Sequence, residues 1–142
     1  MVKADDLLEA YSSLDHSYEM REEEAIDTAC LLAFDYDYPE QECEVVIDSD
    51  EFTAVCPWTG LPDFGTVIIR YVPHRKLLEL KSFKYYLLSY RQVGMVQEHV
   101  ANRILQDMVA VCQPRSLALR LDYKTRGGIH TAVEVSYHAP EI

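Results

Sequence analysis

The sequence lacks the long apolar stretch that a membrane-spanning helix requires. None of the apolar runs in its 142 residues approaches the roughly 20 residues that cross a bilayer. Residues 1–29 are acidic and do not have the basic-then-apolar layout of a secretory signal peptide. We therefore expect a cytoplasmic protein of one domain, long enough to bury a core and with its cysteines reduced.

Metal-binding patterns are also absent. The four cysteines form no C-x-x-C pair, and no cluster of cysteine and histidine has zinc-finger spacing. These cysteines are Cys30, Cys43, Cys56 and Cys112. The missing spacing leads us to expect no structural metal.

Glycine is scarce, and the usual signatures of nucleotide binding are missing. The five glycines form neither a G-x-G-x-x-G fingerprint nor a P-loop. A nucleotide would have to be held by separate cations, for which Lys81, Lys84 and Arg126 are candidates. The backbone at Gly127 and Gly128 would allow close approach of phosphates, although a hairpin turn also explains this pair.

Basic residues are rare in the first half of the chain. Residues 1–65 hold 18 acidic and 2 basic residues, whereas residues 66–142 hold 6 acidic and 11 basic residues. The net charge of −11 argues against nucleic acid as a direct partner. The basic second half indicates either a local anionic ligand or subunit partner, or simply an uneven surface.

The hydrophobic pattern predicts an α+β fold. Residues 1–25 look like an acidic helix or arm ahead of a single domain at 26–142, in which residues 34–41 look like a loop. Strand composition marks residues 42–49, 52–56, 65–73, 115–123 and 129–138, and helical periodicity marks residues 78–91 and 97–112. This order predicts an antiparallel sheet with the two helices on one face.

The stretch TAVCPWTGLPDFGTV, residues 53–67, is the first candidate for chemistry. Cys56 ends a strand-like run, and Asp63 lies in the proline- and glycine-punctuated loop that follows. A thiolate is a nucleophile, and a nearby carboxyl group could protonate the atom that gains charge when sulfur adds. A cysteine-protease arrangement is disfavoured because no histidine is near. The structural alternative is a buried cysteine and an aspartate that caps a turn.

The predicted helix at 78–91 carries two contrasting stripes. One consists of Lys81, Lys84, Leu88 and Arg91, and the other of Glu79, Phe83, Tyr86 and Tyr90. The two stripes could hold phosphates and a planar ring, respectively. In the alternative interpretation, the aromatic residues belong to the core and the lysines are solvated.

Together these segments resemble one enzyme family. ELKSFKYYLLSYR resembles the signature of the NADPH-dependent 7-cyano-7-deazaguanine reductases, the nitrile reductases of queuosine biosynthesis. The positions that match are Glu79, Leu80, Lys81, Ser82, Lys84, Tyr85 and Tyr86. CPWTGLPDFGT is similar to the family's catalytic loop and TRGG to a later cofactor segment, so the likeness spans about residues 30–138.

The resemblance implies an architecture and a set of roles. It implies a tunnelling fold, with a four-stranded antiparallel sheet in each subunit and active sites between the subunits of a ring-shaped homo-oligomer. Cys56 would be the nucleophile and Asp63 the acid. The implied substrate-binding residues are Leu78, Glu79, Leu80, Gln97 and Glu98. The implied NADPH-binding residues are Leu80, Lys81, Lys84, Arg126 and Gly127. Many members have histidine where this sequence has Gln97, and here His99 follows instead.

The implied reaction begins when the thiolate adds to the nitrile and forms a thioimide. Two NADPH molecules then reduce the thioimide to the aminomethyl product, a precursor for tRNA modification. Two alternatives stay open: a non-reducing purine-binding protein of the tunnelling fold, and a relative that installs an amidine on tRNA. The lysine-rich signature and the net charge of −11 disfavour the tRNA-acting relative.

Overall fold

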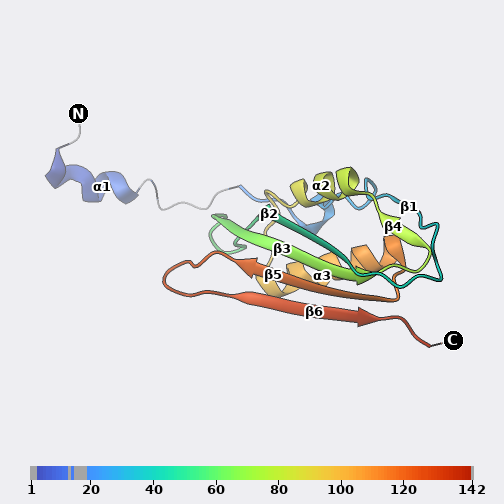
Figure 1. Cartoon of the computed structure of the whole chain (residues 1–142). Coiled ribbons are helices and arrows are strands. Elements are labelled where there is room, and N and C mark those ends of the chain that lie inside the picture. The colour runs from blue at the N-terminus through green and yellow to red at the C-terminus, as the bar shows by residue number, and fades with distance from the viewer. Residues whose placement is uncertain (1–2, 13, 15–18, 142) are drawn as a thin grey trace.

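The computed structural model describes residues 3–12, 14 and 19–141. Its main body is a four-stranded antiparallel sheet in the order β2-β3-β5-β6, with α2 and α3 packed on one face (Figure 1). The strands are β2 (Val45–Val55), β3 (Pro62–Val72), β5 (Ser116–Tyr123) and β6 (Ala132–His138), and the helices are α2 (Leu80–Leu88) and α3 (Gln97–Cys112). The α+β class, the antiparallel sheet and the placement of both helices are as the sequence predicts.

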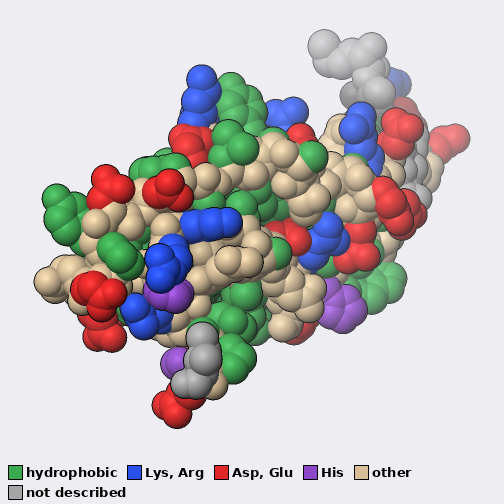
Figure 2. All heavy atoms as spheres, turned by 90° about the vertical axis from the view of Figure 1, so that its right-hand side faces the viewer, with side chains coloured by type: hydrophobic (Ala, Val, Ile, Leu, Met, Phe, Trp, Pro, Cys, Tyr) green, Lys and Arg blue, Asp and Glu red, His purple; other side chains and the backbone are tan. Residues whose placement is uncertain are grey.

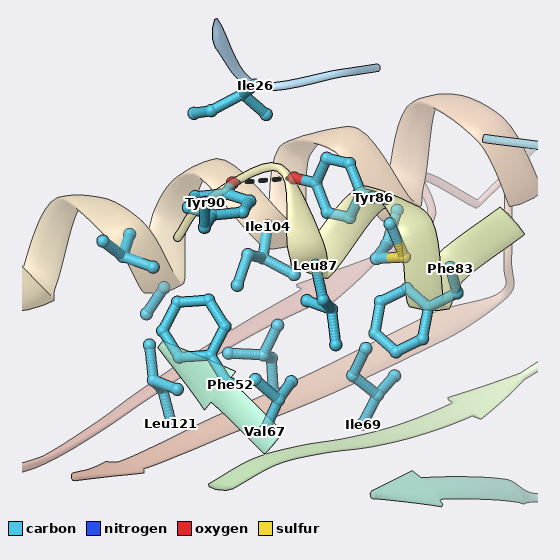
Figure 3. Packing of buried hydrophobic residues seen from close by; sticks show 14 of the residues in the cluster. Ile26, Phe52, Val67, Ile69, Phe83, Tyr86, Leu87, Tyr90, Ile104 and Leu121 are labelled. Carbon is cyan, nitrogen blue, oxygen red and sulfur yellow. Dashed lines mark hydrogen bonds between the residues drawn. The ribbon is translucent and has the colours of Figure 1, made fainter. Parts of the chain in front are cut away.

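The core lies between the sheet and the two helices. Leu117, Leu119 and Leu121 alternate along β5 with exposed or half-buried neighbours, so one face of the strand is apolar. Figure 3 shows sheet side chains meeting helix side chains; its labelled members are Ile26, Phe52, Val67, Ile69, Phe83, Tyr86, Leu87, Tyr90, Ile104 and Leu121. Burying a large apolar side chain contributes roughly 1.5–3 kcal/mol, so this layer holds the helices on the sheet.

A β-bulge joins the two strand-like segments that the sequence shows at 42–49 and 52–56. The pairing of β2 with β3 shifts between Ser49 and Phe52. Ile47, before the bulge, and Phe52, after it, both face the helices, although residues five positions apart in a regular strand point to opposite faces. The bulge therefore keeps one apolar face across a strand whose side-chain period is two.

A second, small sheet was not predicted. β1 (Ala33–Asp35) pairs antiparallel with β4 (Lys76–Leu78). The expected loop at 34–41 therefore begins inside a strand. Both strands have three residues, too few to show alternation, and their pairing joins segments more than 40 residues apart in the sequence.

The predicted helix at 78–91 is shorter in the structure. Glu79 is its N-cap, and the helix ends at Leu88. Tyr86 and Tyr90 are fully buried, and their hydroxyl groups hydrogen bond to each other (2.8 Å) (Figure 3). The Tyr86 hydroxyl also donates to Asp107 Oδ2 (2.6 Å), and Arg103 pairs with the same oxygen (2.9 Å). The aromatic stripe is therefore part of the core.

The N-terminal segment meets the domain through its backbone at Arg21. The Arg21 N–H donates to Gln92 O (2.6 Å), and Arg21 O accepts from the Gly94 N–H (3.0 Å). Before this point lie two short elements, a 3-10 helix at Ala4–Asp6 and α1 (Leu7–Ser12), which projects from the main body (Figure 1). A second 3-10 helix at Glu23–Ala25 leads into the domain.

The uneven charge of the sequence is redistributed by folding. The acidic β2 pairs with the more basic β3, because antiparallel pairing places the two halves of the chain side by side. Figure 2 shows carboxylates and cations intermingled on the face that includes the β1–β4 end. In the part of the chain that the structure describes, no helix is long and apolar enough to cross a membrane.

Candidate active site

A pocket of about 370 Å³ brings together five residues that the sequence singled out. They are Cys56, Asp63, Gln97, Glu98 and Arg126. Cys56 lies in the turn after β2, Gln97 and Glu98 at the start of α3, and Arg126 in the connection between β5 and β6. Asp63, which the sequence placed in the loop, is the second residue of β3, because that strand begins at Pro62 and pairs with the end of β2. The pocket therefore depends on the tertiary fold.

Sheet pairing and a backbone clip bring these segments together. Ala54 pairs with Asp63 across β2 and β3, so Cys56 and Asp63 lie near the same end of the sheet. The Val55 N–H donates to Val93 O (3.1 Å), and the Met95 N–H donates to Val55 O (3.3 Å). The segment before α3 is thus fixed beside the end of β2, and the first turn of α3 begins at the pocket.

The loop that carries Cys56 closes on itself. The Cys56 N–H donates to Leu61 O (2.9 Å), and the Gly60 N–H donates to Cys56 O (2.7 Å). Gly60 has φ 71°, a left-handed conformation in which a side chain is unfavourable. Two hydrogen bonds and one glycine therefore fix the position of the thiol.

The environment of the Cys56 thiol favours its ionised form. Burial alone would raise its pKa, because Cys56 is only 8 % exposed. The Thr59 hydroxyl, the N–H groups of Trp58 and Thr59, and Arg126 are donors that favour the thiolate and together outweigh burial, so the pKa of Cys56 is lowered. By contrast, burial raises the pKa of Cys112 to about 11. Of these two thiols, Cys56 is the one prepared as a nucleophile.

Arg126 connects the thiol with the carboxyl group. Its Nη1 lies 2.6 Å from Asp63 Oδ1, and its guanidinium also helps to lower the pKa of the Cys56 thiol. Asp63 is 9 % exposed, whereas the Arg126 side chain is more than half exposed. A half-exposed cation therefore neutralises a nearly buried carboxylate beside the candidate nucleophile.

The first turn of α3 supplies polar groups to the opposite wall. Gln97 and Glu98 both line the pocket, and Glu98 is exposed. A carboxylate at this position can accept hydrogen bonds from the N–H edge of a heterocycle. Trp58 and Ile129, both largely exposed, add apolar surface to the lining. The pocket thus combines a thiol, two carboxyl groups and apolar walls.

The other predicted site residues lie elsewhere on the chain. They are Leu78, Glu79, Leu80, Lys81 and Lys84. The Leu78 N–H donates to the Tyr71 hydroxyl (3.1 Å), and Tyr71 follows Asp63 by eight residues along β3, roughly 25 Å. Leu80 and Lys84 line a separate pocket of about 220 Å³ against β2. Gly127 lies beside Arg126 in the β5–β6 connection.

Glu79 has a structural role of its own. Its Oε1 accepts from the Lys81 N–H (2.9 Å) and its Oε2 from the Ser82 N–H (2.7 Å). These bonds, the one from Ser82 first, lower the pKa of Glu79. The cap therefore holds an ionised carboxylate in a fixed orientation, and each oxygen keeps a further lone pair for a ligand.

Several pocket residues were not predicted from the sequence. Thr59, Trp58 and Lys124 line the pocket or contact its thiol. Thr59 lies three residues after Cys56 in a tight turn, and that spacing was the available signal for a donor to sulfur. Among the described residues, no group of three or more His, Cys, Asp or Glu side chains is arranged to hold a metal ion.

Comparison with known proteins places these features in a family. The model of the family described as QueF-like protein matches residues 62–142, more than half of the chain. The chain belongs to the QueF-like protein family. The match begins at the first residue of β3 and includes Asp63, α2, α3 and the Arg126 hairpin.

Relatives of this QueF-like chain carry one name. A protein of Caldicellulosiruptor bescii is 52 % identical over 114 residues, covering 80 % of this chain and 87 % of its own. A protein of Caldanaerobacter subterraneus subsp. tengcongensis is 50 % identical over 118 residues, covering 83 % and 88 %. Both are named NADPH-dependent 7-cyano-7-deazaguanine reductase. These names agree with the resemblance seen in the sequence.

A solved structure shares the fold. The apo form of an archaeosine synthase described as QueF-Like superposes with a TM-score of 0.60 at 20 % identity, covering 70 % of this chain and 96 % of that one. At this identity the likeness concerns the fold alone.

Proposed function

We propose that this chain reduces the nitrile of 7-cyano-7-deazaguanine to 7-aminomethyl-7-deazaguanine with NADPH, a step in queuosine tRNA modification. The observation that carries the proposal is a thiol prepared for ionisation beside a nearly buried carboxyl group in one pocket. The names of relatives that are about half identical support the same reaction.

Cys56 and Asp63 share the first chemical step. The Cys56 thiolate adds to the nitrile carbon, one C–N π bond breaks, and the electron pair moves to nitrogen. Asp63 takes up the proton that leaves the Cys56 thiol and gives it to that nitrogen, so the product is a neutral thioimide and the Asp63 carboxylate is restored. Arg126, 2.6 Å from Asp63, stabilises this carboxylate. Cys56 and Asp63, both nearly buried, are thus placed to exchange a proton and a negative charge inside the pocket.

Glu98 and Gln97 orient the heterocycle in the proposed complex. The Glu98 carboxylate accepts from the N–H groups of the purine-like ring, while Trp58 and Ile129 cover its faces. Glu79, Leu78 and Leu80 complete the substrate site from a neighbouring copy, because in one chain they lie at the other end of β3.

The exposed cations fit NADPH. Lys81 and Lys84 form no salt bridge to any described residue, and no atom lies within 4 Å of where a Cβ of Gly127 or Gly128 would stand. Lys81, Lys84, Leu80, Arg126 and Gly127 would hold the cofactor by point charges and an open backbone. The chemistry that NADPH supplies is hydride donation, twice per nitrile, since nitrile and primary amine differ by four electrons.

We further propose that the chain adopts the tunnelling fold and assembles as a homo-oligomeric ring. Two findings support this: the sheet ends in the edge strands β2 and β6, which have no outer partner strand among the described residues, and the predicted site residues form two separate groups on one chain. A ring places the Glu79 end of one copy beside the Cys56 pocket of the next.

A covalent-adduct experiment tests the function. Protein mixed with 7-cyano-7-deazaguanine alone should gain the mass of the nitrile and a new thioimide absorbance. Adding NADPH should discharge the adduct to the amine, with two NADPH consumed. Cys56→Ala should abolish both events, whereas Cys30→Ala, a matched change at a thiol outside the pocket, should leave them unchanged.

Each other outcome points to a different function. No adduct with wild-type protein would favour a purine-binding protein with an unreactive Cys56. An adduct that NADPH leaves intact would favour the amidine-forming activity. A Cys56→Ala protein that still reduces the nitrile would refute the covalent mechanism.

A further inference from the structure

Tyr123 lies directly behind the Cys56 pocket. It is the last residue of β5, and only 2 % of it is exposed. Its N–H donates to Thr131 O (3.0 Å). Thr131 lines the pocket, and so does Lys124, the residue that follows Tyr123 in the chain. The backbone around Tyr123 therefore forms one wall of the pocket while its ring points to the core side of the sheet.

The sheet register places Tyr123 next to Asp63. Tyr123 pairs with Gly65, and Asp63 precedes Gly65 by two residues, so it is the diagonal neighbour of Tyr123 on the same sheet face. A Cβ at Gly65 would lie 3.4 Å from Tyr123 Cδ1, which shows that the ring occupies the space above this glycine. Diagonal neighbours about 7–8 Å apart are within reach of aromatic side chains.

The Tyr123 hydroxyl has no hydrogen-bond partner. Among the side chains that the structure describes, its oxygen is the one buried polar atom in this condition. The buried hydroxyl groups of Tyr86 and Tyr90, in contrast, bond to each other, and Tyr86 also bonds to Asp107. A buried hydroxyl without a hydrogen-bond partner lowers the stability of the free protein. We therefore look for a partner that the hydroxyl gains when a ligand binds.

The surroundings keep this hydroxyl protonated. Burial raises the pKa of Tyr123, and the carboxylates of Asp63 and Glu98 raise it further. Tyr123 is therefore a hydrogen-bond donor throughout the working pH range. The two pocket carboxylates lie close enough to raise the pKa of its hydroxyl.

We propose that Tyr123 is a positioning residue for Asp63, with its hydroxyl donating a hydrogen bond to the Asp63 carboxyl group in the substrate-bound pocket. The inference rests on the proposed function, in which Asp63 protonates the nitrile nitrogen. The bond forms at the carboxyl oxygen that does not carry the proton, so the acidic proton is turned toward the substrate. It also supplies the partner that Tyr123 lacks in the free protein.

Tyr123→Phe tests the proposal, because it removes one oxygen and keeps the ring over Gly65. We expect the melting temperature to stay the same or rise, since an unpaired buried hydroxyl is removed. We expect adduct formation in a single turnover to slow by roughly tenfold to a hundredfold through misorientation of the acid, with substrate affinity nearly unchanged.

The pH profile and a double-mutant cycle separate positioning from packing. The Tyr123 hydrogen bond stabilises the Asp63 carboxylate, so its loss should move the basic limb of the adduct rate to higher pH. In an Asp63→Asn background, Tyr123→Phe should have little further effect. Tyr90→Phe is the matched control: it breaks the bond to Tyr86 and should lower the melting temperature without changing the adduct rate or its pH profile.

The possible failures are distinguishable. If wild-type protein forms no adduct, the proposed function fails and this inference fails with it. If wild-type protein reacts but Tyr123→Phe has the wild-type rate and pH profile, only this inference is overturned. Equal slowing in the presence and absence of Asp63→Asn, or a loss that follows a lowered melting temperature, would also overturn it.

Discussion

At the residue scale, the lowered pKa of Cys56 comes from its immediate neighbours. The thiol is as buried as many core side chains, and burial by itself opposes ionisation. The Thr59 hydroxyl, two loop N–H groups and Arg126 reverse that effect because all of them are donors that favour the thiolate. Cys112, equally free of disulfide bonds but surrounded by the core, has no such donors, and burial raises its pKa to about 11. Chemical competence thus depends on donors and not on exposure.

We predict that iodoacetamide alkylates Cys56 at lower pH than the other thiols whose pKa values are shifted. The pKa of Cys56 is lowered, whereas burial and then Asp27 raise the pKa of Cys30, so the thiolate of Cys56 persists to lower pH. Peptide mass spectrometry across pH 6–10 measures each site on the same chain, with Cys112 as the slowest. Thr59→Val removes the hydroxyl donor and should shift the Cys56 profile to higher pH. A Cys56 profile that coincides with that of Cys30 would contradict the prediction.

At the scale of elements, α2 depends on its cap. Glu79 satisfies two N–H groups of the first turn, and the apolar side of the helix is buried through Phe83, Tyr86 and Leu87. The same carboxylate is the proposed anchor for substrate in a neighbouring copy. Because the cap holds it in one orientation, the helix presents a preorganised acceptor.

Replacing Glu79 by alanine should destabilise the protein, and replacing it by glutamine should do so less. Alanine leaves both N–H groups unpaired, whereas the glutamine carbonyl oxygen can still accept one bond, so we expect a loss of about 2–4 °C in melting temperature for alanine. The lowered pKa of Glu79 determines how the cap's contribution to stability depends on pH. The cap stabilises the folded protein above the unfolded-state pKa, and this contribution is lost as the pH falls through the folded-state pKa. Thermal melts between pH 3 and 7 measure both effects. The gap between wild type and Glu79→Ala should therefore narrow at low pH; a constant gap would argue against the ionised cap.

Local pattern was sufficient for most of these elements. The alternation at Leu117, Leu119 and Leu121 predicts β5, and the spacing of Val100, Ile104 and Met108 predicts α3, because each has one buried face. The bulge in β2 and the β1–β4 pair could not be predicted. The bulge interrupts the period of two, and three-residue strands show no period at all.

The sequence predicts the proximity of some residues of the candidate site better than that of others. Cys56 and Asp63 are separated by a short turn, so their proximity follows from the chain itself. Glu98 lies at the same pocket because backbone hydrogen bonds join Val55 to the segment before α3, and these bonds are tertiary contacts. The unpaired hydroxyl of Tyr123 has no sequence signal, because alternation along β5 predicts only a buried aromatic residue.

At the scale of the whole molecule, one chain holds two incomplete halves of the proposed site. Cys56, Asp63 and Glu98 are at one pocket, and Glu79 follows β4 near the far end of β3. β2 and β6 are the edges of the sheet and have no described partner strand on their outer sides. Edges of this kind invite pairing with another copy, and a head-to-tail contact that closes on itself forms a ring. Each proposed site then takes one half from each of two neighbours.

Two damaged chains should therefore restore activity when they share a ring. Cys56→Ala removes the nucleophile and Glu79→Gln weakens the anchor while keeping part of the cap, so each variant alone should have little activity. Co-expression with two different tags and tandem purification yields mixed oligomers. In these, a site that takes its pocket from the Glu79→Gln chain and its anchor from the Cys56→Ala chain is intact, which random assembly makes about a quarter of all sites. Nitrile-dependent NADPH oxidation should recover to about that fraction of wild type.

The matched control pairs Cys56→Ala with Asp63→Asn; these residues share one pocket, so no mixed site is intact and activity should stay low. Equal recovery in both pairs, or none in the first, would show that the site does not combine Cys56 and Glu79 from different copies.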